Sequence, residues 1–547
     1  MAVVFRLYNG TIYKAMDKHK IVKKQKAQEK AKFDSQPQMA GQAEFFPPAL
    51  RPLVIVLLFI TAFGVRVYHI DEPPLDFHPG RQYQCAIIAR SMYLEASKSA
   101  PQWRRQIARL NREAVPRMEL PIVEFIASIA YRIAGGEYLW IPRLTSSIFW
   151  LIGGIVLYLL VKEIFSADAA IFSTAFYLFL PYGVIASRSF QPNPLMIMLL
   201  VFSIWGIFRY HKQPSTRRLL IAAGLSALAL FVYPVSLFPV FAAFIFMSIY
   251  KYGIRKTVID SKFWLFTVIA ILPCAIYFGY ALFIGGFMKG YSERAFLPRL
   301  LLQSFFWKGW LRQIEAVFGL PVLIAALLGV VMFPAGLAKA MVSGLLLSYV
   351  VYCLIFTYHI HTHDYYQLPF VPTVTVCLAA VASLITERLS QTCTRWYRRV
   401  PALAVIVFAV FLSIYKVQPE LFDPNYKYYV EMSKEIGDTV GHSTKSIFLA
   451  YDYAKPLRYH GELSGFNWPN AGDFRSYAFS GVPILSAEER FSKVCLKDSP
   501  EYFIVTDFRS FQQQPDLQKF LIQNFPILVK NSNYLIFDLR RKLKPTG

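Results

Sequence analysis

One short stretch concentrates the side chains that could do chemistry. Residues 71–92, DEPPLDFHPGRQYQCAIIARSM, begin where the first long apolar run of the chain ends. Two adjacent prolines prevent a helix at the start of this stretch. Its charged and titratable side chains are those of Asp71, Glu72, Asp76, His78, Arg81 and Arg90. Such dense charge beside a membrane span indicates a reaction site.

The carboxylates of this stretch could remove a proton from an acceptor. Asp76 is two residues from His78 and five from Arg81, so a cation and a second proton-exchanging group lie close to it. We predict that Asp76 is the catalytic base. Asp71 and Glu72 are expected to be solvated loop carboxylates, although either could take that role instead.

Arginines near the same surface could bind a phosphate. From Arg81 the sequence has helical spacing, and neither Arg81 nor Arg90 can point into lipid at low cost. Guanidinium groups grip phosphate through paired hydrogen bonds. Arg188, in a short turn further along the chain, is a third member of this predicted phosphate site.

A second motif, TYHIHTHDYY at residues 357–366, holds three alternating histidines. In an extended conformation they would share one side of the backbone and could bind a divalent metal together with an aspartate. That predicted set is His359, His361, His363 and Asp364. The favoured alternative is histidines that donate hydrogen bonds to phosphate, with His363 as the candidate, so no cofactor is required.

Composition identifies the class of protein. The chain has 547 residues, of which 55% are hydrophobic and 17% charged, against about 25% charged in soluble domains. Eleven runs are predicted to cross the hydrocarbon core, which takes roughly 20 residues each. They are residues 52–69, 144–162, 168–186, 194–209, 218–234, 235–250, 262–284, 317–333, 338–357, 367–386 and 401–416. The formal charge of +24 falls mainly in the N-terminal tail and in short loops, where it indicates topology and contact with anionic lipid rather than nucleic acid.

Basic loops predict the orientation. The segment 120–134 carries Glu124 and Arg132 and is too short to span, so we expect it to lie at the interface. The basic residues at 209–218, 251–262 and 388–399 then fall on the same side as the basic tail, residues 1–50. That side is predicted to be cytoplasmic, and the loops that hold the reactive residues are predicted to lie on the outer side, which is periplasmic or lumenal.

The sequence after the last span is typical of a soluble domain. Strand-like runs at 446–450, 502–506 and 534–539, with a helix-like run at 516–524, predict a small α/β domain over residues 417–547. Of the six cysteines, Cys85 and Cys495 are the one pair left for a disulfide.

The order of several motifs resembles a known family. The chain has IARSMY at residues 88–93, ELP at 119–121, SRSFQPNP at 187–194 and HDYYQLPFVP at 363–372. Together they resemble the GT-C superfamily of polyprenyl-phosphate-sugar glycosyltransferases. The nearest branch is the bacterial group similar to dolichyl-phosphate-mannose protein mannosyltransferases and lipid A aminoarabinose transferases.

The resemblance implies a fold and a reaction. It implies an all-α membrane module over residues 51–416, with a large first outer loop at 70–140. It also implies an inverting transfer of a sugar from a polyprenyl-phosphate donor to an acceptor hydroxyl of a protein, lipid or glycan, at a bacterial inner membrane. The residues expected to line the substrate groove are His78, Glu119, Tyr365 and Tyr366.

The chain departs from the family pattern at one position, and its sequence also allows other functions. Many relatives place an Asp-Glu pair just ahead of the IAR-type helix, where this chain has Arg81-Gln82, so the base is assigned from local spacing. A transporter or lipid flippase is the main alternative, and a non-catalytic scaffold is a lesser one. Charges are sparse in the middle of the predicted spans and no internal repeat is evident, which favours an enzyme.

Overall fold

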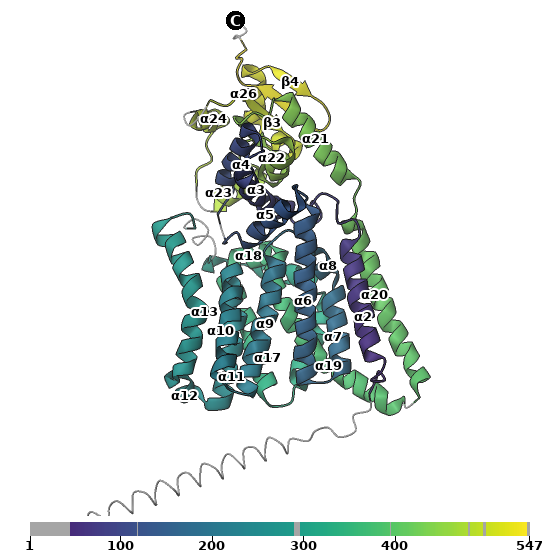
Figure 1. Ribbon diagram of the computed structural model, residues 1–547. Coiled ribbons are helices and arrows are strands. Elements are labelled where there is room, and N and C mark those ends of the chain that lie inside the picture. The colour runs from purple at the N-terminus through teal and green to yellow at the C-terminus, as the bar shows by residue number, and fades with distance from the viewer. Residues whose placement is uncertain are drawn as a thin grey trace, which may run out of the picture.

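The structure is a computed structural model that describes residues 44–117, 119–288, 296–393, 395–479, 482–495 and 499–543. Long helices form a bundle, and a small α/β domain lies on one end of it (Figure 1). We call this end of the bundle the domain end. Residues 1–43, most of the predicted tail, lie outside the described residues.

Each predicted span coincides with a helix or with a bent pair of helices. Among the described residues, seven helical runs are long and apolar enough to cross a membrane, or up to nine if each bent pair counts as one span. The seven are α6 (Trp140–Ile164), α9 (Asn193–Lys212), η1 with α11 (Pro234–Tyr252), α13 with η2 (Ser261–Ile284), α17 (Leu337–Ile355), η4 with α19 (Asp364–Thr392), and α20 (Val400–Leu421) continuing into α21 (Asn425–Thr439).

Proline and glycine produce the two bent pairs. Helices α7 (Ala167–Phe179) and α8 (Pro181–Ser187) meet at 63°, where Pro181 cannot continue the hydrogen-bond ladder. Helices α15 (Ser304–Val317) and α16 (Leu320–Met332) meet at 89° across Gly319, whose φ is 79°. Two further predicted spans, α2 (Arg51–Val67) and α10 (Thr216–Val232), have 17 residues each, or about 26 Å of helix.

The first long loop folds into three short helices at the domain end. They are α3 (Pro79–Ala96), α4 (Gln102–Ala114) and α5 (Ile122–Ala134), and they lie between the bundle and the α/β domain (Figure 1). Helix α5 has 13 residues, or about 20 Å, so it cannot cross the roughly 30 Å core. The segment is thus a short helix that does not span, as predicted, and its place at the membrane interface stays a prediction.

The C-terminal domain contains a five-stranded sheet with the order β2-β1-β3-β5-β4. Strands β1, β2 and β3 are parallel, whereas β5 is antiparallel to both β3 and β4. The strands are β1 (Ser446–Leu449), β2 (Gly465–Asn467), β3 (Tyr502–Val505), β4 (Ile527–Lys530) and β5 (Leu535–Asp538). The three predicted strands and the predicted helix, α26 (Pro515–Asn524), are therefore confirmed.

Other short elements complete the chain. They are α12 (Ile254–Ile259), η3 (Pro298–Leu302), α18 (Thr357–Thr362), η5 (Trp396–Arg399), η6 (Tyr451–Ala454), α22 (Lys455–Gly461), α23 (Ala471–Phe479), α24 (Ala487–Cys495) and α25 (Phe508–Gln512). The expected disulfide does not form. Cys85 is buried in α3 and Cys495 is exposed at the end of α24, and both are free thiols.

Candidate functional site

Two motifs that are far apart in the sequence meet at the domain end of the bundle. The imidazole Nε2 of His78 lies 2.7 Å from Oδ1 of Asp364, although 286 residues separate them. The backbone amide of Tyr365 donates a second hydrogen bond, of 2.7 Å, to the same carboxylate oxygen. Both side chains remain accessible, with 31% of His78 and 26% of Asp364 exposed. A substrate could therefore reach this pair.

The backbone holds His78 in an unusual conformation. His78 has φ 45° and ψ 64°, in the left-handed region, and Pro79 follows as the first residue of α3. A non-glycine residue in this region is uncommon and is strained unless its surroundings hold it. The ring of Tyr365 packs edge-on against the imidazole at 4.8 Å. Such strain is typical of positions that a functional site fixes.

The ion pair also defines which imidazole nitrogen is the proton donor. An ionised carboxylate can only accept hydrogen bonds, so Nε2 of His78 carries the proton that Asp364 receives. In the neutral ring Nδ1 is then the basic atom. The arrangement therefore provides a base that a second group orients, as in activated hydroxyl chemistry.

Cations and a second carboxylate surround this pair. Arg81 donates to Glu119 at 2.9 Å, and both side chains are 14% exposed. Lys455, from the α/β domain, donates to Gln84 on α3 at 2.9 Å. We call the following residues the interface cluster: His78, Arg81, Glu119, His363, Asp364, Asp452 and Lys455.

Burial lowers the pKa of two members of the interface cluster. Burial and the nearby Arg81 guanidinium lower the pKa of Lys455 to about 8, so it is close to its titration point near neutral pH. Burial and the neighbouring His78 lower the pKa of His363 to about 4. His363 is therefore neutral at pH 7 and can offer a phosphate a hydrogen bond but no charge.

A strained turn of the C-terminal domain reaches into the interface cluster. Asp452, Tyr453 and Ala454 are three consecutive non-glycine residues with φ of 51°, 55° and 58°. The Asp452 carboxylate accepts a hydrogen bond from the Gly80 amide. A Cβ at Gly80 would lie 2.8 Å from Asp452 Oδ1, so any larger residue there would displace the Asp452 carboxylate.

The predicted metal site is not assembled. The histidine motif forms the helix α18 rather than an extended strand, so alternate residues no longer share one side. His359 stacks on Tyr366, His361 Nδ1 bonds to the Thr357 carbonyl oxygen at 2.8 Å, and Asp364 holds His78. Across the described ranges, no three His, Cys, Asp or Glu side chains are placed to hold a metal ion.

Asp76 lies in the protein interior. Its side chain is 1% exposed, and it forms a close ion pair with Arg143, which is also 1% exposed. Nε of Arg188 lies 3.5 Å from the same carboxylate oxygen, and Gln82 donates to the other oxygen at 3.0 Å. Both oxygens are therefore occupied by protein donors, and the side chain has no path to an acceptor.

The two arginines around Asp76 also fix the loop that leads to His78. Arg188 donates to the carbonyl oxygens of Tyr68 and His69, both at 2.8 Å. Arg143 donates to the carbonyl oxygens of Ile70 and Glu72. Arg188 is thus a structural residue in this conformation rather than a phosphate ligand. Sequence reasoning missed Arg143, although an arginine in the first turn of an apolar span is itself a signal.

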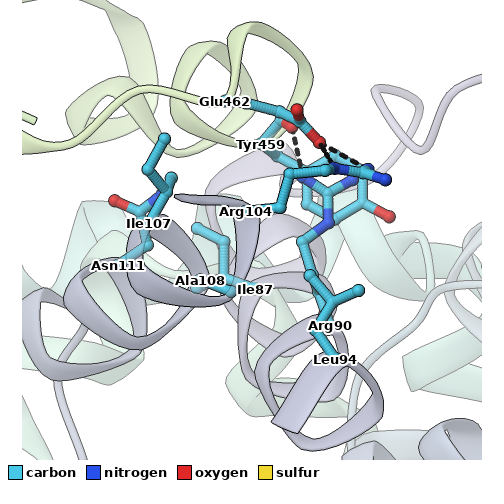
Figure 2. A pocket seen from close by; sticks show the side chains of 9 residues that line it. All are labelled: Ile87, Arg90, Leu94, Arg104, Ile107, Ala108, Asn111, Tyr459 and Glu462. Atoms are coloured by element: carbon cyan, nitrogen blue, oxygen red, sulfur yellow. Dashed lines mark hydrogen bonds and ion pairs between the residues drawn. The ribbon is translucent and has the colours of Figure 1, made fainter. Parts of the chain in front are cut away.

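Arg90 lies away from the interface cluster. Residues 81 and 90 are nine positions apart on α3, which places them about 180° apart around the helix axis. Arg90 donates to Glu137 at 2.8 Å. Its guanidinium group lies over the Tyr459 ring, 3.5 Å from the ring centroid (Figure 2). The cavity beside it has a volume of about 10 Å³, which is no larger than one water. Arg90 therefore fastens α3 to the C-terminal domain.

The other residues named from the sequence are mostly buried and contact neighbouring side chains. Tyr366 is 2% exposed and packs against His359, whereas Tyr365 is 9% exposed and supports His78. Glu72, expected to be solvated, is 2% exposed and pairs with Lys427 at 3.0 Å. Glu119 is held by its ion pair with Arg81.

Comparisons with known proteins agree with this architecture. Residues 115–278 match the family model described as dolichyl-phosphate-mannose-protein mannosyltransferase. The structure of ArnT from Cupriavidus metallidurans bound to undecaprenyl phosphate superposes with a TM-score of 0.57 at 12% identity, over 89% of this chain and 98% of that one. The chain has the GT-C fold.

Other GT-C structures give the same result. ArnT from Cupriavidus metallidurans in the apo state has a TM-score of 0.55 at 12% identity, covering 89% of this chain and 97% of that one. The apo oligosaccharyltransferase of Archaeoglobus fulgidus has a TM-score of 0.55 at 11% identity, covering 88% and 73%. No curated protein sequence matches the chain.

The predicted resemblance to the GT-C superfamily is therefore confirmed. The match over residues 115–278 and the shared fold both agree with that resemblance, and the long apolar helices are typical of a multi-pass membrane protein. The matched segment 115–278 begins after the stretch 71–92, so the roles of residues in the interface cluster rest on their geometry in this chain.

Proposed function

We propose that this protein transfers a sugar from a polyprenyl-phosphate donor to an acceptor hydroxyl, with inversion at the anomeric carbon. The reaction takes place at the interface cluster, on the periplasmic side of a bacterial inner membrane. The observation that carries this proposal is the accessible His78–Asp364 pair near Arg81 and Lys455, at the domain end of the bundle.

His78 acts as the general base in this proposal. Nδ1 takes the proton of the acceptor hydroxyl while Asp364 holds the ring and balances the imidazolium that forms. The acceptor oxygen forms a bond to the anomeric carbon, and the bond from that carbon to the phosphate oxygen breaks. The electron pair leaves with the lipid phosphate, and the proton passes from His78 to water. Asp76 is a positioning residue, because two arginines hold one of its oxygens and Gln82 holds the other.

Arg81 and Lys455 stabilise the departing phosphate. Negative charge grows on the phosphate as the bond breaks, so fixed cations stabilise the transition state more than the ground state. Glu119 orients the guanidinium of Arg81, and neutral His363 donates a hydrogen bond. In this proposal Tyr365 and Tyr366 act as supports for the histidines, and no metal ion takes part.

The basic loops support the orientation. Arg209, Arg217 and Arg218 lie where α9 ends and α10 begins, at the bundle end opposite the α/β domain (Figure 1). An excess of arginine and lysine is typical of the cytoplasmic side. The interface cluster then faces the periplasm, where a polyprenyl-phosphate sugar would present its head group.

A single substitution tests the role of His78. Purified H78Q protein in proteoliposomes with a polyprenyl-phosphate sugar should transfer sugar about 100- to 10,000-fold more slowly than wild type, because the base is lost. H69Q is the matched control, since His69 also has a positive φ in the same loop and lies outside the interface cluster. Equal rates for H78Q and wild type would remove His78 from this role.

A further inference from the structure

The C-terminal domain holds a second pocket that the proposed transfer reaction does not use. It has a volume of about 640 Å³, within the range of small-ligand sites. Its lining includes Tyr451, Asn470, Arg475, Asp507, Arg509 and Gln513. These residues come from loops and helices that follow three different strands.

The pocket lies where sheet topology favours a ligand. Strand β1 is flanked by β2 on one side and β3 on the other, and all three are parallel. The connection that leaves β1 leads to β2 on one side, whereas the connection that leaves β3 leads toward β4 and β5 on the other side. The strand order therefore has a switch point between β1 and β3. Ligands of open α/β sheets bind outside the carboxyl ends of the strands at such a point. Tyr451 follows the end of β1 by two residues, and Asp507 follows the end of β3 by two.

The charge of the pocket indicates an anionic ligand. Arg475 and Arg509 are exposed, and within the part of the chain that the structure describes neither takes part in an ion pair. The single lining carboxylate, Asp507, accepts the Ser510 amide hydrogen at 2.9 Å and so caps α25. Two guanidinium groups are thus left to bind a phosphate or carboxylate.

The other lining groups suit a sugar. The Tyr451 side chain is 52% exposed and offers an aromatic face beside the arginines. Asn470 uses its side-chain oxygen to cap α23 through Gly472 and Asp473, at 2.8 and 3.1 Å. The amide groups of Asn470 and Gln513 can exchange hydrogen bonds with hydroxyls.

One residue that lines the pocket is adjacent in the chain to a residue of the interface cluster. Tyr451 lines the pocket, and the next residue, Asp452, accepts the hydrogen bond from Gly80, two residues after His78. Helix α23, which contributes Arg475, lies at the edge of the domain nearest the bundle (Figure 1). A molecule held in the pocket could extend a hydroxyl past the strained turn 452–454 toward the base.

We propose that this pocket binds the acceptor, and that the acceptor is a saccharide carrying a phosphate or carboxylate group. This inference rests on the proposed transfer function and names its acceptor class. The arginines hold the anionic group, Tyr451 packs against a sugar ring, and the free hydroxyl is the one that reaches His78.

Binding measured without any donor tests this proposal separately from transfer. The full-length protein in detergent is titrated by calorimetry with glucose 6-phosphate, glucuronate, glucose and inorganic phosphate. The two anionic sugars should bind more tightly than either glucose or phosphate. R475Q and R509Q should each weaken them by about tenfold or more, because each removes a charged hydrogen-bond donor.

R541Q is the matched control, since Arg541 is 81% exposed on the same domain and follows β5 at the end of the sheet opposite the carboxyl end of β3. It should bind the probes as wild type does. The proposal is overturned if no anionic sugar binds, if the two pocket variants bind as well as R541Q, or if phosphate alone binds equally tightly. Arginine-dependent binding in a protein that never transfers sugar would leave the pocket in place and refute the transfer function.

Discussion

At the scale of single residues, Asp76 and Asp364 differ in how much of each carboxylate solvent can reach. Asp76 is 1% exposed between Arg143 and Arg188, so its negative charge serves to balance theirs. Asp364 is 26% exposed and has one imidazole as its ionic partner among the described residues. A base must reach its proton, so accessibility favours the His78–Asp364 pair over Asp76.

Removing the charge of Asp76 should mainly affect stability. D76N leaves two buried guanidinium groups without their counter-charge, which costs about 3–5 kcal/mol in comparable buried pairs. Thermal unfolding in detergent should show a clearly lower midpoint, while the fraction that stays folded retains turnover. If D76N melted like wild type but lost transfer, Asp76 would be the base that its sequence position predicts.

Lys455 should give the reaction an alkaline limit. Its pKa is lowered to about 8, from the ordinary lysine value, because burial and Arg81 disfavour its charged form. The cation is present below pH 8 and is lost as the pH rises through that value. The kcat/KM for the lipid-linked donor should therefore fall above about pH 8.

K455R is the test of that assignment, because arginine stays charged across this range. The pH profile of K455R should lose the alkaline fall that wild type shows. A fall at the same pH in both proteins would assign it to another group.

At the scale of elements, the sequence predicted helices better than it predicted which side chains share a face. Arg81 and Arg90 were expected to share a phosphate, yet nine residues of helix place them on opposite sides of α3. The histidine motif was expected to be extended, yet it forms α18. Helical phase and the start of a short helix depend on packing against distant segments, which local spacing does not contain.

The crossing of α21 and α22 is a second element-scale feature that can be tested. A Cβ at Gly437 would lie 2.1 Å from the Gly461 carbonyl oxygen, so G437A must push these helices apart. Overpacking of this kind costs about 1–3 kcal/mol. The unfolding midpoint of G437A should fall, and α22, which carries Lys455, should lose its position.

G224A is the control for this substitution. Gly224 lies within α10, and a Cβ there meets nothing within 4 Å. Its unfolding midpoint should equal or slightly exceed that of wild type, because alanine favours the helix. Similar midpoints for G437A and wild type would show that the two helices have room to separate.

At the scale of the whole molecule, several polar contacts fix the C-terminal domain to the helices of the first long loop. Arg90 and Glu137 hold Tyr459, Arg104 pairs with Glu462, and Lys455 reaches Gln84. The sequence predicted that this domain exists and indicated its strands. It did not predict that a domain residue joins the interface cluster, because the contacts cross more than 350 residues of chain.

The overall architecture followed from composition and run length. Every predicted span coincides with a helix or a bent pair, since about 20 apolar residues in a row leave few other structures available in lipid. The pairing of His78 with Asp364 could not be predicted in the same way. Each residue stood in a recognised motif, but only the folded bundle brings the two motifs together.

A structure of the protein with bound polyprenyl phosphate tests the central claim most directly. We predict the phosphate within hydrogen-bonding distance of Arg81 and Lys455, with its isoprenoid tail directed into the membrane and His78 open toward the sugar position. A phosphate bound only at the opposite end of the bundle, near Arg209 and Arg218, would contradict this prediction.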